Sequence, residues 1–160
     1  MTKYPAEWNQ TFIQMAELIA QRSRCTKHQV ACIITKDRRP IITGINGTPP
    51  GYLNCDEKFY NIPTNTKSKE YELYADEHHL WSNHNEQHAE QNAVAFAAKY
   101  GISILDTVVY LTMTPCVDCA KLLAVSGIQE LHYHQTYHRY PTQGIDFLES
   151  NNIPCFQTLP

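Results

Sequence analysis

VVYLTMTPCVDCAKLLAVSGIQELHYH, residues 108–134, decides the class of fold, because a helical pattern lies between two strand-like ones. Residues 108–112 and 130–134 have the composition of strands. Residues 116–126 have the composition of a helix, and Gly127 follows them, as glycine commonly follows the end of a helix. A strand, a helix and a strand in succession predict an α/β protein.

The same alternation continues on both sides of this stretch. Downstream, we expect a helix at about residues 142–150 and a strand at 153–157. Upstream, residues 88–100 are rich in alanine and precede Gly101, which predicts another helix.

The first third of the chain adds one more helix and a hairpin. Apolar residues spaced by three and four predict an amphipathic helix over 6–21. Two β-branched runs at 30–34 and 41–45, separated by a polar stretch, predict two paired strands. The expected architecture is therefore an α/β sheet with helices on both faces.

Residues 46–86 form a long polar insert in what we expect to be a single domain of residues 1–160. The insert opens with two glycines and two prolines and stays polar, so we expect no regular element in it. Such lengths inside compact domains are usually functional or disordered. Seven acidic residues and three lysines give the insert a charge of −4, which leaves +1 on the remainder and makes an anion site easier there.

Composition and charge narrow the class of function. The 160 residues carry a net charge of −3, which argues against a surface built to bind nucleic acid. No apolar run approaches the roughly 20 residues of a membrane helix, and the first ten residues lack the apolar centre of a secretory signal. We therefore expect neither nucleic acid nor a membrane among the partners, and a cytoplasmic location, in the host cytoplasm if the protein is viral. In that compartment six cysteines favour metal ligands, catalytic groups or core positions over disulfides.

Two short motifs carry the chemistry. His88-Ala89-Glu90 opens one predicted helix, and Pro115-Cys116-Val117-Asp118-Cys119 leads into the next, giving H-x-E followed by P-C-x-x-C. This pairing is the established signature of zinc deaminases.

The ligand types explain why this signature suits hydrolysis. A catalytic zinc needs three protein ligands and an open position, which His88, Cys116 and Cys119 supply. The start of a helix favours the thiolate forms of the two cysteines. Glu90 is then free to take a proton from water and to deliver it to a ring nitrogen and the departing ammonia. A C-x-x-C motif alone would favour a structural zinc site or a redox pair, but H-x-E upstream makes that reading unlikely.

The residues alone do not decide whether the protein has a second metal site. Cys25, Cys55, His78 and Glu86 are scattered along the chain, and buried cysteine is common in cores. Their spacing gives no reason to unite them.

Several segments resemble the deoxycytidylate (dCMP) deaminases of the cytidine and deoxycytidylate deaminase superfamily, in particular the bacteriophage type. The resemblance covers residues 18–156. It is carried by QRSRC (21–25), QVACII (29–34), GINGTPPG (44–51), NEQHAEQNA (85–93), YLTMTPCVDCAKLLAVSGI (110–128) and QTY (135–137).

The resemblance implies a fold, a reaction and a substrate site. The fold would be a three-layer α/β/α structure around a five-stranded mixed sheet, and the enzyme would be a hydrolase that converts dCMP and water to dUMP and ammonia, for thymidylate synthesis. Asn46 matches the family residue that contacts deoxyribose, and Tyr137 matches an aromatic residue near the pyrimidine. Ser23, Arg24, Lys27 and Arg139 lie in family regions near the nucleotide and are candidates for the phosphate.

The resemblance also implies a second zinc, an oligomer and regulation. Phage members hold a structural zinc with residues that align with Cys25, Cys55, His78 and Glu86. The family is typically a homohexamer, and Phe96 and Lys99 match positions near its subunit interface. It is activated by dCTP and inhibited by dTTP with magnesium, near a loop occupied here by Gly44, Ile45, Asn46 and Gly47. Ile45 replaces the usual tyrosine of that loop.

Three alternatives remain at this point. A tRNA adenosine deaminase shares both motifs but should show a basic face, which the acidic insert and net charge disfavour. A cytidine deaminase would be indifferent to the 5′-phosphate. A catalytically silent metal-binding module would not need Glu90 beside the open position.

Overall fold

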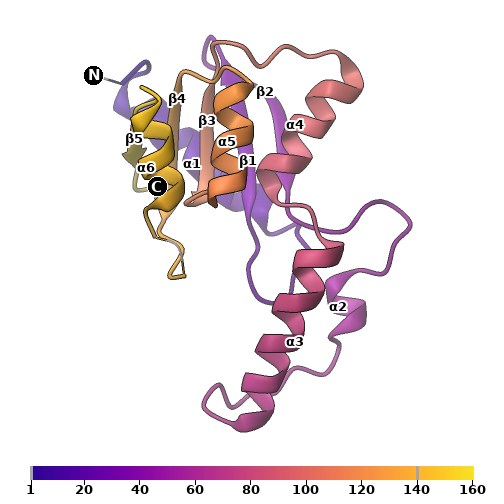
Figure 1. The fold of residues 1–160 in the computed structure, drawn as a ribbon. Coiled ribbons are helices and arrows are strands. Elements are labelled where there is room, and N and C mark those ends of the chain that lie inside the picture. The colour runs from indigo at the N-terminus through magenta and orange to yellow at the C-terminus, as the bar shows by residue number, and fades with distance from the viewer. Residues whose placement is uncertain (1, 140) are drawn as a thin grey trace.

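The computed structural model describes residues 2–139 and 141–160 and builds an α/β fold around one sheet (Figure 1). In chain order the elements are α1 (Ala6–Ala20), β1 (Ala31–Lys36), β2 (Arg39–Ile45), α2 (Cys55–Lys58), α3 (Lys69–Asn85), α4 (Ala89–Tyr100), β3 (Val108–Met113), α5 (Val117–Val125), β4 (Glu130–Gln135), α6 (Gln143–Ser150) and β5 (Cys155–Gln157). The elements predicted outside residues 46–86 are confirmed, with ends that differ by up to two residues.

The sheet is mixed and has five strands in the order β2-β1-β3-β4-β5. β1 is antiparallel to both β2 and β3, whereas β3, β4 and β5 are parallel to one another. The parallel strands are joined through α5 and α6, as the alternating pattern predicts. In the β1–β2 hairpin, Asp37 and Arg38 both have positive φ, a conformation that suits the twist of a two-residue turn.

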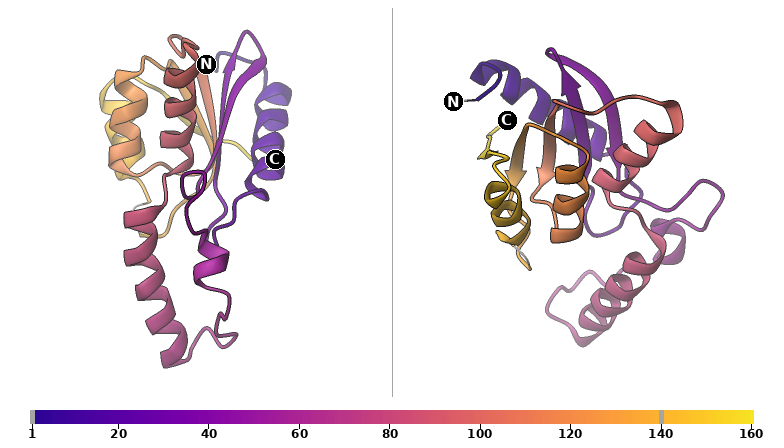
Figure 2. Two further views of the ribbon diagram at one scale, coloured as in Figure 1. Left: turned by 90° about the vertical axis from the view of Figure 1, so that its right-hand side faces the viewer. Right: turned by 45° about the horizontal axis from the view of Figure 1, so that its top comes forward.

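Helices cover both faces of the sheet, so the predicted three-layer arrangement is confirmed (Figure 2). On one face, Phe12, Ile13 and Ala16 of α1 pack against Ile33 and Tyr110 of the sheet. On the other face α4, α5 and α6 form a larger core. No helix in the described part of the chain combines the length and apolar character needed to cross a membrane.

The expectation that residues 46–86 lack regular structure is wrong. Residues 55–85, which we call the arm, contain α2 and α3 and extend from one end of the sheet (Figures 1 and 2). Only Tyr74 and His78 of α3 are buried, so its apolar pattern is too weak to indicate a helix. The usable signal is at its start, where the Ser68 side chain accepts a hydrogen bond from the Tyr71 N–H and acidic residues fill the first turn.

A small core of its own holds the arm. Cys25, Cys55, Phe59 and Tyr74 form a buried cluster that is separate from the two cores beside the sheet. Phe59 also stacks edge-on against Trp81 of α3. This cluster holds α3 close to the starts of α4 and α5, with which it lines one pocket.

Candidate metal centre and active-site pocket

The H-x-E motif lies at the start of α4. His88 is the residue just before the helix, and Gln91 accepts a hydrogen bond from the His88 backbone N–H at 2.9 Å. Glu90 falls in the first turn and is only 4% exposed. Two residues apart, the imidazole and the carboxylate both line one pocket.

The P-C-x-x-C motif begins α5 directly opposite. Cys116 is the residue before the helix, and Cys119 is buried in its first turn. The Nδ1 atom of His88 lies 3.6 Å from the sulfur of Cys116 and 3.4 Å from that of Cys119. Tetrahedral zinc with ordinary Zn–N and Zn–S bonds separates such ligand atoms by roughly 3.5 Å. Both the donor set and its spacing therefore fit zinc.

The electrostatics of this centre favour the thiolate form of one of the two cysteines, because the hydrogen bond between the thiols lowers the pKa of Cys116 and raises that of Cys119. A hydrogen bond from Cys119, assisted by His88, lowers the pKa of the Cys116 thiol to about 4. The start of α5 contributes backbone N–H groups and the positive end of the helix dipole. Burial raises the pKa of the Glu90 carboxyl, and the charge of His88 opposes that shift.

The pocket has a volume of about 180 Å³ and brings several predicted residues to the metal centre. Asn46, Tyr137, Lys27 and Arg139 all line it together with Glu90. The Tyr137 ring meets the ring of His28 edge-on, with centroids 5.7 Å apart. These two rings form an aromatic wall of the pocket.

Asn46 is held rigidly by the protein. Its side-chain oxygen accepts hydrogen bonds from the Val30 N–H at 2.8 Å and from the Ser23 hydroxyl at 2.7 Å, and its amide donates to the His28 carbonyl at 2.8 Å. Ser23 is buried behind Asn46 and does not line the pocket. Its contact is therefore with Asn46, whose orientation it sets.

Arg24 points away from the pocket. Its guanidinium lies 2.9 Å from a carboxylate oxygen of Asp56 and 3.1 Å from one of Glu57, at the base of the arm. In this structure Arg24 ties the arm to the segment after α1.

The predicted regulatory loop lies beside the pocket and is tightly packed. A Cβ atom on Gly44 would lie 2.7 Å from the Ala93 backbone nitrogen and would also meet the Ala89 carbonyl, so β2 approaches α4 more closely than a side chain would permit. Gly47 exchanges backbone hydrogen bonds with Gln87, the residue before His88. Ile45 is half-buried between them, and its carbonyl accepts a hydrogen bond from the Asn92 side chain.

The predicted interface residues lie on the outer face of α4. Phe96 is 43% exposed, and its ring lies 4.4 Å from that of Tyr100. Lys99 extends over the Tyr100 ring. Glu90 belongs to the same helix, but it is buried in the first turn and is not part of this exposed face.

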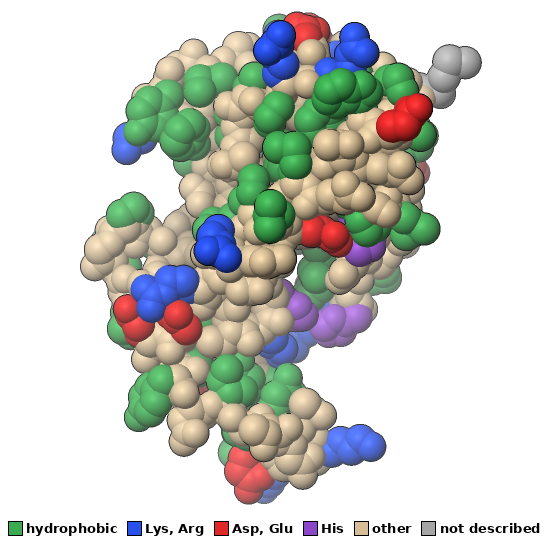
Figure 3. Space-filling model, turned by 180° about the vertical axis from the view of Figure 1, so that it is seen from behind, with side chains coloured by type: hydrophobic (Ala, Val, Ile, Leu, Met, Phe, Trp, Pro, Cys, Tyr) green, Lys and Arg blue, Asp and Glu red, His purple; other side chains and the backbone are tan. Residues whose placement is uncertain are grey.

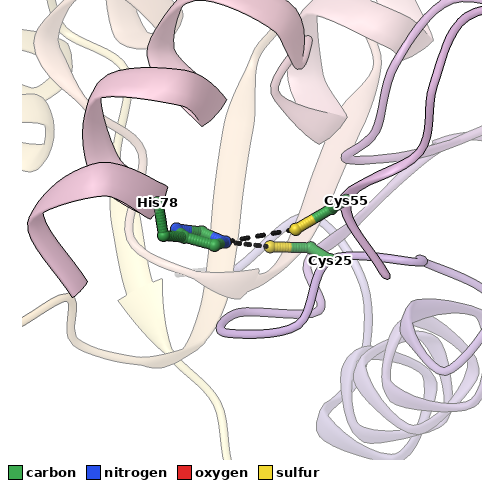
Figure 4. A group of neighbouring side chains, drawn as sticks. All are labelled: Cys25, Cys55 and His78. Carbon is green, nitrogen blue, oxygen red and sulfur yellow. Dashed lines mark hydrogen bonds between the residues drawn. The ribbon is translucent and has the colours of Figure 1, made fainter. Parts of the chain in front are cut away.

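Three of the four residues predicted for the second metal site lie together, although they are far apart in sequence. The Nε2 atom of His78, on α3, lies 3.5 Å from the sulfur of Cys25 and 3.3 Å from that of Cys55 (Figure 4). All three are buried, and their ligand atoms are close enough to share one ion. A hydrogen bond from Cys25 lowers the pKa of the Cys55 thiol to about 4.

Glu86 lies beside this cluster. Burial raises the pKa of its carboxyl to about 7, and the charges of Cys55 and His78 act on it. Its Oε1 atom is buried without a hydrogen-bond partner among the described residues. A carboxylate oxygen left in this way fits a fourth ligand for zinc.

Several pocket residues outside the two motifs were not predicted from the sequence. His28, His79 and Gln87 line the pocket, as do Ser82 and Asn83 of α3. Gln87 precedes the H-x-E motif and could have been found by proximity to it. Nothing in the sequence pattern places the α3 residues at the pocket.

Comparison with known proteins agrees with this geometry. Residues 6–135 match the family model described as the cytidine and deoxycytidylate deaminase zinc-binding region. The deoxycytidylate deaminases of Enterobacteria phages T2 and T4 are 37% and 36% identical to this chain, over 91% of it and 89% and 87% of theirs. The crystal structure of dCMP deaminase from the cyanophage S-TIM5, in complex with dCMP and dUMP, superposes with a TM-score of 0.75 at 28% identity, covering 97% of this chain and 99% of that one.

Proposed function

Because this chain belongs to the cytidine and deoxycytidylate deaminase family and is a deaminase of the zinc-binding type, we propose that it hydrolyses dCMP to dUMP and ammonia. The observation that carries the proposal is that Glu90 shares one pocket with Asn46, Tyr137 and the ligand group of His88, Cys116 and Cys119, of which His88 and Cys116 line the pocket. The binding of dCMP and dUMP by the cyanophage relative supports the choice of nucleotide.

His88, Cys116 and Cys119 would hold the zinc, which when bound lowers the pKa of a water molecule toward roughly 7. Glu90 takes a proton from the attacking water and gives it to the pyrimidine N3 atom. It then takes the proton of the hydroxyl group now on C4 and passes it to the 4-amino nitrogen, which leaves as ammonia as the C4 carbonyl forms. Its burial suits this role because a carboxyl with a raised pKa exchanges protons more readily near neutral pH.

The remaining pocket residues would position the substrate. Asn46, fixed by three internal hydrogen bonds, contacts the deoxyribose, and Tyr137 borders the pyrimidine. Lys27 and Arg139 bind the 5′-phosphate, to which cations form charge-assisted hydrogen bonds. Ser23 acts through Asn46, and Arg24 remains a phosphate candidate from the sequence resemblance alone.

We assign a second zinc to Cys25, Cys55, His78 and Glu86. Three buried ligand atoms and the unpartnered Glu86 oxygen support this assignment. A metal there would join the arm to the segment after α1, since its ligands come from both.

The wider role that we propose rests on the sequence resemblance. The dUMP product would supply thymidylate synthesis in the cytoplasm. Magnesium-bound dCTP and dTTP would activate and inhibit the enzyme through the loop of Gly44, Ile45, Asn46 and Gly47, and the active form would be a homohexamer.

Ammonia release from dCMP, deoxycytidine and CMP tests the function directly. We expect turnover of dCMP, raised by magnesium with dCTP and suppressed by dTTP. Equal turnover of deoxycytidine would instead indicate a nucleoside deaminase, and no ammonia from any of the three would contradict the proposal.

A further inference from the structure

Besides His78 and His88, which are candidate metal ligands, four cationic or imidazole side chains line the pocket. Lys27, His28, His79 and Arg139 all line it, at positions that the H-x-E and P-C-x-x-C motifs do not include. Histidine side chains lie beside a Lys or Arg side chain where the arm joins the rest of the molecule (Figure 3).

We propose that His79 is a specificity-determining residue that, together with Lys27 and Arg139, binds the 5′-phosphate of the nucleotide. This inference rests on the proposed function, because it assigns the phosphate end of the same substrate. It differs from the sequence expectation in drawing one phosphate ligand from the arm.

The distribution of charge in the pocket favours this orientation of a nucleotide. Glu90 and the thiol of Cys116, whose pKa is lowered, line the pocket beside the proposed zinc, so the uncharged base fits there better than a phosphate does. A dianion is stabilised beside Lys27 and Arg139, the two cationic side chains that line the pocket. Asp76 of α3 is the acidic group that acts on both Lys27 and His79, and it is exposed to solvent, which weakens its effect.

The arm explains why His79 lies at this place, where its Nε2 atom is 3.3 Å from the side-chain nitrogen of Asn83. The preceding residue, His78, points into the cluster with Cys25 and Cys55. Neighbouring side chains on a helix point about 100° apart, so anchoring His78 also sets the direction of His79. Imidazole donates a hydrogen bond to phosphate whether or not it is protonated.

The variant His79→Ala tests the inference, with His84→Ala as the matched control. His84 lies on the same helix and is exposed, and it does not line the pocket. In the zinc-loaded full chain, kcat/KM would be measured for dCMP and for deoxycytidine, and the binding of inorganic phosphate would be followed by calorimetry.

We expect His79→Ala to lower kcat/KM for dCMP about tenfold, as the loss of a hydrogen bond to a charged group implies. The value for deoxycytidine should stay unchanged, phosphate should bind more weakly, and His84→Ala should match the unaltered protein. Equal losses on both substrates would assign His79 a structural role and overturn the inference, as would no loss on dCMP. If the unaltered protein deaminates neither substrate, the proposed function fails, and the phosphate titration of the two variants then decides on His79 by itself.

Discussion

Glu90 illustrates how much the surroundings of a single residue determine. A glutamate on a helix surface is ordinarily a solvated charge, but this one is buried in the first turn of α4 and lines a pocket with His88 and Cys116. Its raised pKa follows from the loss of solvent, so the fold itself prepares the carboxyl for proton transfer.

Replacing Glu90 with glutamine should abolish proton transfer and keep the metal. We expect kcat to fall by roughly a hundredfold or more, because an amide cannot accept the water proton. Steady-state ammonia release gives the rate, and metal analysis gives the zinc content.

Asp118→Asn provides the control for this prediction. It makes the same acid-to-amide change in the first turn of α5, where the Asp118 side chain is 84% exposed. Its activity should match that of the unaltered protein. A Glu90→Gln enzyme that keeps its rate would remove Glu90 from the mechanism.

At the scale of elements, the arm depends on contacts that α3 cannot make alone. The helix buries only two of its side chains, and an isolated helix with so few packed residues is marginal in water. Its stability therefore comes from the aromatic residues around Phe59 and from the ligands that meet at His78.

Removing one of these ligands should release a metal ion and loosen the arm. We expect Cys55→Ser to bind one zinc per chain in place of two. We also expect protease to cut it faster within residues 55–85, because a segment that no metal holds in place unfolds locally more often. Metal analysis and limited proteolysis measure the two effects.

Cys155→Ser is the matched control, because Cys155 lies in β5, outside both clusters. That variant should keep two zinc ions and the original cleavage pattern. Retention of two zinc ions by Cys55→Ser would show that no metal binds between the arm and the segment after α1.

The packing of β2 against α4 makes a second prediction for the elements. In Gly44→Ala, the new methyl group would meet the Ala93 backbone, so one of the two elements must shift. Overpacking of this kind costs roughly 1–3 kcal/mol of the free energy of unfolding. Chemical denaturation would measure that loss.

The neighbouring substitution Thr43→Ala separates this packing effect from a general effect of changing β2. Thr43 is exposed on the same strand, and its replacement should alter the unfolding free energy by less than about 0.5 kcal/mol. A Gly44→Ala protein as stable as the original would mean that β2 and α4 can separate without cost.

At the scale of the whole molecule, the outer face of α4 leaves aromatic surface exposed. Phe96 and Tyr100 form an exposed ring pair there, whereas Glu90 of the same helix is buried. If this face joins subunits, as the family resemblance predicts, a charge placed in it should separate them.

We expect Phe96→Asp to reduce the mass in solution from that of an oligomer toward the 18.4 kDa of one chain. Light scattering coupled to size exclusion measures this mass. Leu80→Asp, at an exposed apolar position on the arm, should leave the mass unchanged. A monomeric unaltered protein, or an oligomer that survives Phe96→Asp, would contradict the role of this face.

The sequence by itself determined the features that depend on neighbouring residues. The strand and helix pattern around residues 108–134 predicted an α/β fold, because hydrophobic periodicity reflects local backbone geometry. The two cysteines of P-C-x-x-C lie within one turn of α5, so their convergence on one ligand could be expected from spacing alone. That His88 joins these two cysteines could be expected from the known pairing of the H-x-E and P-C-x-x-C motifs.

Tertiary structure alone decided the features that depend on distant segments. His78 meets Cys25 across 53 positions, Arg24 turns to the acids of α2, and His79 reaches the pocket from a helix whose sequence barely indicates its presence. Such contacts arise from how the elements pack and not from local spacing. A mostly polar helix has no apolar stripe in its sequence, so only the packed structure reveals which of its sides is buried.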